Sequence, residues 1–348
     1  MISVLIDTYN HEKFIQNAIE SVLAQSWFAD NRGFEIVVVD DGSTDRTPEL
    51  LAEYGDTIRV VRKPNGGQAS AFATGLEHCA GEIIVFLDGD DWWHVDKVAR
   101  VMAEFAANPD CVAVGHGIIV ADDLSGSHER QHPPERIILN LGSDADVRPF
   151  HSNMAFMGTS RLAARREALD RVGRPPDALT YEADEYFFTL LPAIGDVHIL
   201  PDCLTYYRLH ATNLYQASNA LAGVAAGKIK LRKRAEIFRC LAEVLPHELV
   251  RHSIPATRAA AIIEPLDIAA TRLELEVDGG SRAATLAVER RQHAWLKSRG
   301  IRARALARAG VFWAALLLPP PSFYALRTRY AGLRARRVSK TSDQKGNA

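Results

Sequence analysis

Four apolar runs alternate with helical patterns in the first 90 residues, and no other feature constrains the fold of this chain as strongly. The runs are Val4 to Ile6, Ile36 to Val39, Ile58 to Val61 and Ile83 to Leu87. Each run is apolar throughout rather than at every second residue, which is typical of strands buried on both faces of a parallel sheet. The pattern predicts an α/β fold in which a mostly parallel sheet is flanked by helices.

A polar loop follows each predicted strand. These loops span Asp7 to Asn10, Asp40 to Asp45, Lys63 to Gln68 and Asp88 to Asp91. In sheets of this kind, ligands bind at the carboxyl ends of the strands, and all four loops belong to that edge. We therefore expect one ligand site built from acidic and glycine-rich loops.

The loops after the second and fourth strands carry five aspartates: Asp40, Asp41, Asp88, Asp90 and Asp91. Carboxylates gathered at one sheet edge repel one another unless a cation neutralises them. Oxygen ligands suit Mg²⁺ and Mn²⁺, which proteins usually hold through one or two carboxylates together with the phosphates of a substrate. The cluster predicts a Mn²⁺ or Mg²⁺ cofactor and a phosphorylated ligand.

The same loops resemble those of family 2 of the nucleotide-sugar-dependent glycosyltransferases. The resemblance rests on Ile6-Asp7-Thr8-Tyr9-Asn10, Ala18 to Gln25, Val38 to Asp45, Asn65-Gly66-Gly67 and Phe86 to Trp93. It is strong over about residues 2 to 100, weaker to about residue 215, and absent beyond. It implies a Rossmann-like GT-A fold and inverting transfer of a sugar from a nucleotide-diphosphate sugar.

The resemblance places a set of residues around the nucleotide sugar. They are Thr8, Tyr9, Asn10, Asp40, Asp41, Gly67, Asp88 and Arg208. Asp40 would accept the N3 hydrogen of uracil, since a carboxylate favours a base that offers an N–H group. Thymine offers the same group, so a UDP-sugar is favoured over a dTDP-sugar only because members of the family usually use UDP-sugars. The transferred group implied by the family is a hexosyl or N-acetylhexosaminyl residue.

The resemblance also assigns the metal ligands. Asp88 and Asp90 form an Asp-x-Asp pair, in which Asp90 would bind the metal that bridges the diphosphate and Asp88 would contact the ribose or the metal. The segment Tyr206 to His210 resembles a late Tyr-Arg-x-His segment of the family. Arg208 could pair with a phosphate. His210 could complete the metal shell, although a structural histidine is an equal alternative.

A second acidic segment, Tyr181 to Phe188, resembles the Glu-Asp motif of the family. Asp184 would be the general base that deprotonates the acceptor hydroxyl, which then attacks C1 of the donor sugar in a single inverting displacement. Ala183 stands where the family usually has an acid, so Glu182 or Glu185 could share the role. The alternative is a solvated acidic helix start, where carboxylates favour the helix dipole.

The acceptor side of the site is less defined. Trp92 and Trp93 could offer a stacking face to an acceptor sugar, yet large aromatic side chains after a sheet are as often in the core. Only one of the two can easily face a cleft. The family implies a hydroxyl of a saccharide or lipid-linked acceptor, in the synthesis of a cell-surface polysaccharide or glycoconjugate.

The chain divides into three predicted parts. Residues 1–215 form the GT-A domain, with nucleotide-sugar binding in 1–120 and the acceptor side and base in 121–215. Within it, Asp122 to Val147 is polar and predicts loop and β-hairpin. Residues 216–296 are rich in Ala, Leu, Arg and Glu and predict a helical extension with breaks near Pro246, Pro255 and Gly279.

Residues 297–348 form a basic amphipathic tail whose end we expect to be disordered. Lys297 to Lys340 holds 11 Lys and Arg residues and no Asp or Glu, around the uncharged stretch Ala309 to Leu326, which prolines interrupt. Basic flanks around an aromatic and leucine-rich segment suit the surface of an anionic membrane. A surface helix pair or an oligomer contact is the alternative. No secretory signal is visible, which predicts a cytoplasmic protein, peripheral on the inner face of the membrane if the tail binds there.

Other functions fit the sequence less well. A catalytically degenerate nucleotide-sugar-binding protein is the main alternative, and Ala183 is its only support. A nucleotidyltransferase would need a glycine-rich and basic triphosphate loop near the first strand, and a dinucleotide-dependent dehydrogenase would need G-x-G-x-x-G there. The motifs indicate a binding site for a nucleotide sugar rather than for nucleic acid. The four separated cysteines predict reduced, buried thiols rather than a metal or redox motif.

Overall fold

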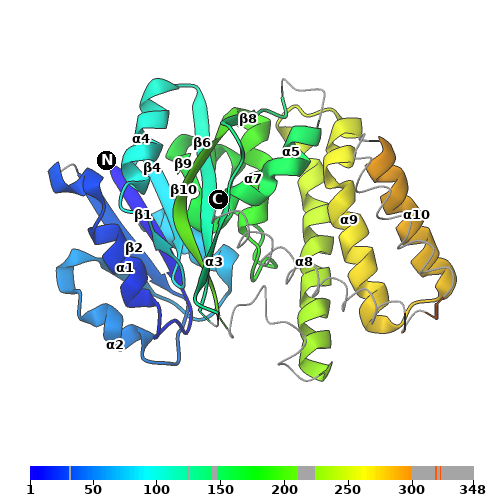
Figure 1. Ribbon diagram of the computed structural model, residues 1–348, viewed down its shortest axis with the longest axis horizontal. Coiled ribbons are helices and arrows are strands. Elements are labelled where there is room, and N and C mark those ends of the chain that lie inside the picture. The colour runs from blue at the N-terminus through cyan, green and yellow to red at the C-terminus, as the bar shows by residue number, and fades with distance from the viewer. Residues whose placement is uncertain are drawn as a thin grey trace, which may run out of the picture. The chain divides into compact units, whose positions relative to one another are not determined.

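The computed structural model describes residues 1–30, 33–123, 125–142, 147–210 and 224–298, together with the isolated positions 318, 319 and 322 (Figure 1). The chain divides into two compact units, which are described separately. The first unit holds residues 1–210 and 245–259, and the second holds residues 211–244 and 260–348. The predicted domain boundary at residue 215 lies outside the described residues.

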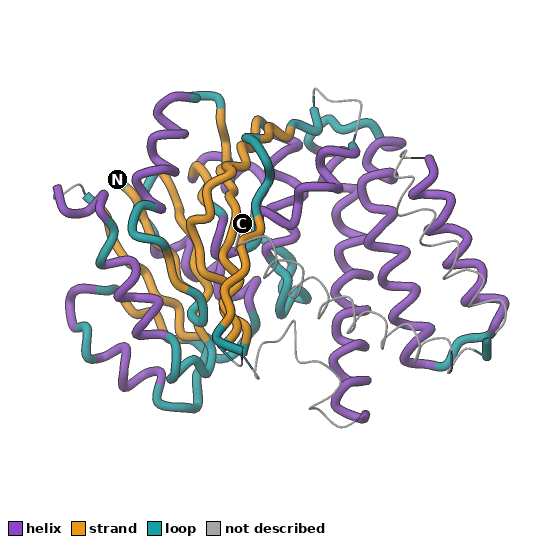
Figure 2. Tube along the Cα trace, viewed as in Figure 1, coloured by secondary structure: helices purple, strands orange, loops and turns teal. Residues whose placement is uncertain are grey.

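A ten-stranded sheet forms the centre of the first unit (Figure 2). Its main strand order is β3-β2-β1-β4-β9-β6-β10-β5, with β7 paired to β6 and β8 to β10. The strands are β1 Ile2–Thr8, β2 Phe34–Asp40, β3 Arg59–Arg62, β4 Ile83–Asp88, β5 Trp92–Trp93, β6 Cys111–Asp122, β7 Ser127–Gln131, β8 Ile137–Leu139, β9 Ala163–Arg165 and β10 Asp196–Leu209. β1 is parallel to β2 and β4, β2 to β3, and β6 to β10. The predicted α/β fold with helices flanking the sheet is confirmed, and the sheet is mixed because β5, β7, β8 and β9 pair antiparallel with their neighbours.

Helices flank this sheet. They are α1 Ile15–Leu23, α2 Thr47–Ala52, α3 Gln68–His78, α4 Lys97–Ala107, α5 Arg148–Asn153, α6 Arg166–Val172 and α7 Asp184–Ile194, with 3₁₀ turns η1 Ser26–Asp30, η2 Gly55–Thr57, η3 Met154–Met157 and η4 Thr159–Arg161. Apolar residues at helical spacing explain the placement of α1, because Ile15, Ala18, Ile19 and Val22 are all buried. At α2 the helix begins at Thr47, and the carboxylate of Asp45 accepts the Thr47 amide at 3.0 Å. Thr47 is therefore the first helical residue of α2.

The inner strands are buried as predicted, but the third strand is not. Val4 to Ile6 and Val37 to Val39 are fully buried, as is the run 84–87 of β4. In β3, Val60 is 41% exposed, and Arg59 and Arg62 are also exposed. The prediction of a buried third strand is wrong because β3 lies at the edge of the sheet and pairs with β2 alone.

The register of the parallel strands brings the polar loops together. Thr8 of β1 pairs with Asp40 of β2, and Asp7 pairs with Asp88 of β4. The Asp41 amide donates to the Thr8 carbonyl at 2.9 Å, and the Gly89 amide to the Asp7 carbonyl at 2.9 Å. These loops therefore meet at the carboxyl edge of the sheet.

Within the described residues, the helical extension consists of α8 Val224–Arg251, α9 Ala256–Asp278 and α10 Arg282–Ser298, of which residues 245–259 belong to the first unit. The breaks predicted near Pro255 and Gly279 are confirmed, but the break near Pro246 is wrong because α8 runs through that residue. A proline inside a helix removes one backbone hydrogen bond and crowds the preceding turn. Leu245 and Leu249 of the same helix are fully buried, and their packing offsets this cost.

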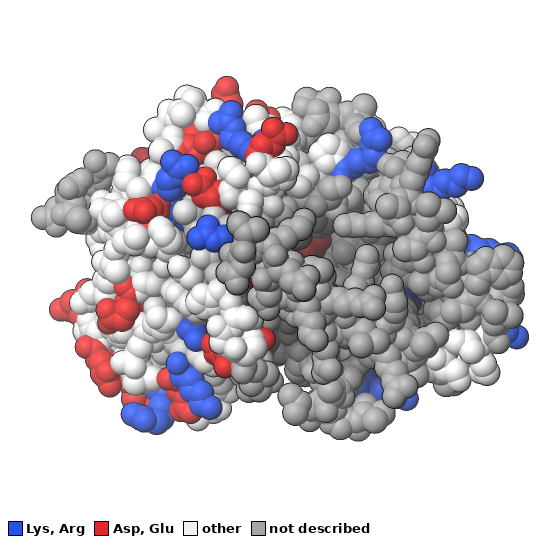
Figure 3. All heavy atoms as spheres, in the orientation of Figure 1, with Lys and Arg blue, Asp and Glu red and all other residues white. Residues whose placement is uncertain are grey.

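The predicted tail lies outside the described residues, except for Lys297, Ser298 and the three isolated positions, so membrane attachment stays a prediction. Among the helices that the structure describes, none is both long and apolar enough to cross a membrane. All four cysteines are free: Cys79 and Cys111 are buried as expected, whereas Cys203 and Cys240 are half-buried. On the face drawn in Figure 3, the acidic and basic side chains of the first unit are interspersed.

Candidate active site

Carboxylates crowd together where β1 and β4 end. Burial and the charge of Asp90 raise the pKa of Asp7 to about 8. Burial and the charge of Asp90 also raise the pKa of Asp91 to about 7. Burial and the charge of Asp7 hold the pKa of Asp88 well above its usual range. The group is therefore under strong mutual repulsion, as the sequence predicted for its loops.

Asp90 is the member of this group with basic neighbours. Its carboxylate lies 3.1 Å from Nε2 of His210 and 3.9 Å from Nε2 of His11. Burial acts to raise the pKa of Asp90, but the hydrogen bond from His210 and the charge of His11 outweigh it and leave this pKa below its usual value. His210 also packs on the ring of Phe14, with ring centroids 4.3 Å apart.

These side chains fit a divalent cation. Oδ1 of Asp7 and Oδ2 of Asp91 are buried and accept no hydrogen bond from any residue that the structure describes. Carboxylate oxygens are a donor set that suits Mn²⁺ or Mg²⁺, and the imidazoles of His210 and His11 lie beside Asp90. Within the described ranges, no group of three or more His, Cys, Asp or Glu side chains is arranged to hold a metal ion by itself.

The residues predicted to bind the nucleobase lie on the loops after β1 and β2. The Asp40 side chain is 1% exposed, and Oδ2 lies 3.3 Å from Nε of Arg62. Its Oδ1 accepts the Ser43 amide at 2.8 Å. Oδ1 of Asn10 accepts the Thr44 amide at 2.8 Å and so ties the two loops together. Thr8 is buried, whereas Tyr9 is 43% exposed at the rim.

Asp41 and Gly67 hold the glycine loop. The Asp41 carboxylate pairs with Lys63 and accepts the amides of Gly66 at 3.0 Å and Gly67 at 2.7 Å. Gly67 has a φ of +81°, and a Cβ there would lie 2.4 Å from Cα of Thr180. Only glycine, which has no Cβ, allows the backbone at residue 67 to lie this close to Thr180. Both Asp41 oxygens are used inside the protein, so its contact with a nucleotide stays a prediction.

Asp184 begins α7 and is turned toward the protein. Its Oδ2 accepts hydrogen bonds from the Thr159 amide at 3.1 Å and the Thr159 hydroxyl at 3.0 Å. Burial raises the pKa of Asp184 although these hydrogen bonds oppose it. Its charge acts on Asp7 and Asp88, although the residue itself is half-buried. The two hydrogen bonds from Thr159 distinguish Asp184 from a fully solvated carboxylate at a helix start, and its role as the general base stays a prediction.

Arg208 joins the end of β10 to the Asp90 loop. Its Nε donates to the Asp90 carbonyl at 2.9 Å and its Nη2 to Oδ1 of Asn17 at 2.7 Å. The guanidinium also lies 4.3 Å from the ring centre of Trp92. These contacts give Arg208 a role in shaping the loop, and its predicted pairing with a phosphate stays a prediction.

The comparisons with known proteins decide the family. The profile of glycosyl transferase family 2 matches residues 3–173. An uncharacterized glycosyltransferase of Nostoc sp. is 32% identical over 231 residues, which cover 62% of this chain and 67% of that protein. The uncharacterized glycosyltransferase EpsJ of Bacillus subtilis is 36% identical over 280 residues, covering 76% of this chain and 79% of EpsJ. The chain belongs to glycosyltransferase family 2.

A solved structure supports the fold of this glycosyltransferase. S. aureus TarS 1-349 in complex with UDP-GlcNAc is 16% identical, covers 95% of this chain and 91% of its own, and has a TM-score of 0.62. At this identity the likeness concerns the fold alone. The predicted GT-A architecture is confirmed.

The two adjacent tryptophans of this glycosyltransferase lie in different surroundings. Trp92 is half-buried and stacks on Tyr206, with ring centroids 4.9 Å apart. Trp93 is 3% exposed and packs in the core, where Nζ of Lys97 lies 3.9 Å from its ring centre. An acceptor role for Trp93 does not fit, because a ring in the core offers no face to a sugar. Trp92 keeps the predicted role as a proposal.

Several residues of the site were missed by the sequence reasoning. Lys97 is fully buried, donates to the Ser160 carbonyl at 2.6 Å, and has a pKa held well below its usual value by burial. Burial lowers the pKa of Arg161, and the carboxylates of Asp91 and Asp184 are among the charges that act on it. The side chain of Gln68 forms hydrogen bonds with Asp88 and with the backbone amide of Ala183. None of these lies in a motif that separates it from an ordinary loop or helix residue.

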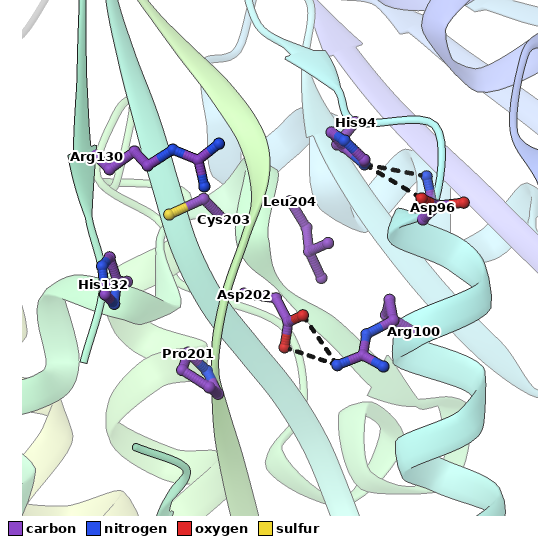
Figure 4. A pocket seen from close by; sticks show the side chains of 9 residues that line it. All are labelled: His94, Asp96, Arg100, Arg130, His132, Pro201, Asp202, Cys203 and Leu204. Atoms are coloured by element: carbon purple, nitrogen blue, oxygen red, sulfur yellow. Dashed lines mark hydrogen bonds and ion pairs between the residues drawn. The ribbon is translucent and has the colours of Figure 1, made fainter. Parts of the chain in front are cut away.

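A hollow of about 430 Å³ has a lining that includes none of these carboxylates (Figure 4). It is lined by His94, Asp96, Arg100, Arg130, His132, Pro201, Asp202, Cys203 and Leu204. Nη2 of Arg100 pairs with Asp202 at 2.9 Å across it. It contains no predicted site residue, so the candidate active site of this glycosyltransferase remains the carboxyl edge of the sheet.

Proposed function

We propose that this protein transfers a sugar from a UDP-sugar to a hydroxyl of a saccharide or lipid-linked acceptor, with inversion and with Mn²⁺ or Mg²⁺. The observation that carries the proposal is a group of aspartates at the end of β4 with a separate, hydrogen-bonded aspartate nearby. Asp88 and Asp90 lie at the end of β4, where Asp90 contacts His210 at 3.1 Å, and Asp184 at the start of α7 is held by the Thr159 hydroxyl of η4 and acts on Asp88 through its charge. The first group suits a diphosphate with its cation, and Asp184 suits a proton acceptor.

Asp40 is the proposed partner of the uracil N3 hydrogen. Its buried Oδ2 pairs with Arg62 but accepts no hydrogen bond within the described residues, so one acceptor site remains. The loop Thr8 to Asn10 lines the same pocket. The similarly folded TarS in complex with UDP and with UDP-GlcNAc supports the choice of uridine.

The donor diphosphate would be held beside Asp90. Asp90 and His210 are the proposed metal ligands, with Asp88 toward the ribose or the metal. A bound Mn²⁺ or Mg²⁺ offsets the charge that develops on the departing diphosphate.

Asp184 is the proposed general base. Its raised pKa makes it a stronger proton acceptor than an exposed aspartate. The acceptor oxygen forms a bond to C1 as its proton passes to Asp184. The bond from C1 to the diphosphate oxygen breaks, and its electron pair leaves with UDP. Attack opposite the leaving group inverts the configuration at C1.

Nucleotide selectivity is tested by thermal stability with UDP, GDP, dTDP and CMP, each with and without Mn²⁺. A ligand of the folded state raises the melting temperature by mass action. We expect the largest rise with UDP and Mn²⁺, and Asp40→Asn should remove the preference for UDP. A larger rise with GDP or dTDP would overturn the uridine assignment.

Turnover is tested as UDP release from a panel of UDP-sugars with saccharide acceptors. Asp184→Asn should lower kcat by about 10²- to 10⁴-fold while UDP binding is kept, because a general base contributes about that factor. The matched control is Asp170→Asn, since Asp170 is 66% exposed on α6 and pairs with Arg166 at 4.0 Å. UDP binding by the wild type without release from any donor would favour the degenerate binding protein.

A further inference from the structure

We infer that Gln68 is a positioning residue that ties Asp88 of the donor side to the turn carrying Asp184 and so sets the spacing between the two. The inference rests on the proposed function, because it assumes that these carboxylates act on donor and acceptor. Gln68 is the first residue of α3 and directly follows the glycine pair. No role was assigned to it from the sequence.

The side chain of Gln68 bonds to three different segments. Its Nε2 lies 3.3 Å from Oδ1 of Asp88 and 3.3 Å from Oγ1 of Thr159. Its Oε1 accepts the Ala183 amide at 2.9 Å. Asp88 ends β4, Thr159 lies on η4 and Ala183 precedes α7, so one amide joins three elements that are distant in the sequence.

The partners fix the orientation of the amide. The Ala183 N–H can only donate, so the oxygen of Gln68 must face it. The two hydrogens of Nε2 are then available for Asp88 and Thr159. The Thr159 hydroxyl has one hydrogen, which it donates to Oδ2 of Asp184 at 3.0 Å. The result is a directed chain of hydrogen bonds from Gln68 through Thr159 to Asp184.

The backbone around Gln68 strengthens this connection. The Gln68 amide donates to the Thr180 carbonyl at 2.8 Å, and the Ala69 amide donates to the Leu179 carbonyl at 3.2 Å. The segment before Asp184 thus satisfies the first amides of α3, which have no partner inside the helix. Gly67 allows the close approach. The side chain of Gln68 extends this contact to Oδ1 of Asp88, while the Ser160 hydroxyl of η4 donates to Oδ2 of the same carboxylate at 3.1 Å.

The test compares Gln68→Met, which keeps the length of the side chain without its polar atoms, with Gln68→Glu, which removes both donors and adds a charge beside Asp88. Gln16→Met is the matched control, since Gln16 is on α1 and bonds to Glu53 at 3.2 Å on the surface. UDP release gives kcat and KM for the donor. Binding of UDP with Mn²⁺ is measured separately, and hydrogen exchange reports the peptide 179–186.

We expect Gln68→Met to lower kcat by about 10- to 100-fold with less than about a threefold change in KM and UDP affinity, because misplacing a catalytic group costs about that much. Gln68→Glu should lose more. Exchange in 179–186 should become faster in both variants and stay unchanged in Gln16→Met. A kcat within about twofold of wild type, or a loss of UDP affinity equal to the loss of kcat, would overturn the inference.

Two further measurements apply if the variant does not fold or if the wild type shows no turnover. If Gln68→Met does not fold, Thr159→Val removes the hydroxyl between Gln68 and Asp184 and should give the same loss of kcat with KM kept. If the wild type releases UDP from no donor, the proposed function fails. Hydrogen exchange then still decides whether Gln68 holds the turn, and unchanged exchange in 179–186 would overturn the inference.

Discussion

The sheet unit and the helical extension are stabilised by different kinds of contact. In the sheet unit, fully buried apolar side chains fill both faces of β1, β2 and β4. In the extension, an apolar cluster of Ile268, Val288, Trp295 and Leu296 is accompanied by ion pairs between the helices. Apolar burial has no preferred direction, whereas ion pairs specify which helix faces which.

Ion pairs join neighbouring helices of the extension. Nε of Arg272 on α9 lies 2.9 Å from Oε1 of Glu289 on α10. Arg239 on α8 pairs with Glu274 at 2.8 Å and also with Asp267. Both Figure 1 and Figure 2 show these helical segments side by side. In the sheet unit, the closely packed apolar core holds the strands that carry the carboxylates. In the extension, the ion pairs determine which helices lie against each other.

The largest effect on stability should come from the sheet core. Phe86 of β4 is fully buried between Phe72 and Phe187, with ring centroids 5.4 and 5.9 Å away. Phe86→Ala should lower the free energy of unfolding by about 3 to 5 kcal/mol, through lost burial and a residual cavity. Urea unfolding measures the change, and hydrogen exchange in β1 and β4 assigns it to the sheet unit. A loss below about 1 kcal/mol would contradict a tightly packed core.

The buried ion pair of the extension should give the next effect. The side chains of Glu289 and Arg272 are 1% and 10% exposed, so Glu289→Ala removes a buried carboxylate from beside a buried guanidinium. We expect a loss of about 2 to 3 kcal/mol in the free energy of unfolding. The double variant Arg272→Met with Glu289→Leu should recover most of it, because both charges are then removed. Failure to recover would show that the pair itself supplies the stability.

An exposed ion pair should matter much less. Arg232 and Asp278 pair while 60% and 62% exposed. Arg232→Ala should lower the free energy of unfolding by less than about 1 kcal/mol, and the effect should fall as salt is raised. Unfolding in urea at low and high salt measures both. A loss as large as that of Glu289→Ala would remove the distinction between buried and exposed pairs.

Thiol labelling sharpens the contrast without any mutation. Burial raises the pKa of Cys79 and of Cys111 to about 12, so both stay protonated and enclosed in the folded sheet unit. Cys240 of the extension and Cys203 are half-buried. At pH 8, an alkylating reagent should modify Cys203 and Cys240 first, and Cys79 and Cys111 only after unfolding. Mass spectrometry of the peptides identifies the order, and early labelling of Cys79 would contradict a closed core.

The fold was predictable because its signals are local. Apolar runs mark β1, β2 and β4, and the loops that follow them meet because parallel strands end at the same edge. Edge position is not local, so the exposure of Val60 was not foreseen. Pro246 is likewise a local break signal that the burial of Leu245 and Leu249 overrides.

Residue order alone establishes the α/β class, the acidic edge and the family resemblance, since all three depend on motifs with short spacing. Tertiary packing decides the rest: that Trp93 lies in the core, that Lys97 is buried beneath it, and that Gln68 reaches both Asp88 and the Asp184 turn. Hydrogen-bond partners from β4, η4 and the start of α7 are brought together by folding. No pattern within one segment contains that information, because each partner is specified by a different part of the chain.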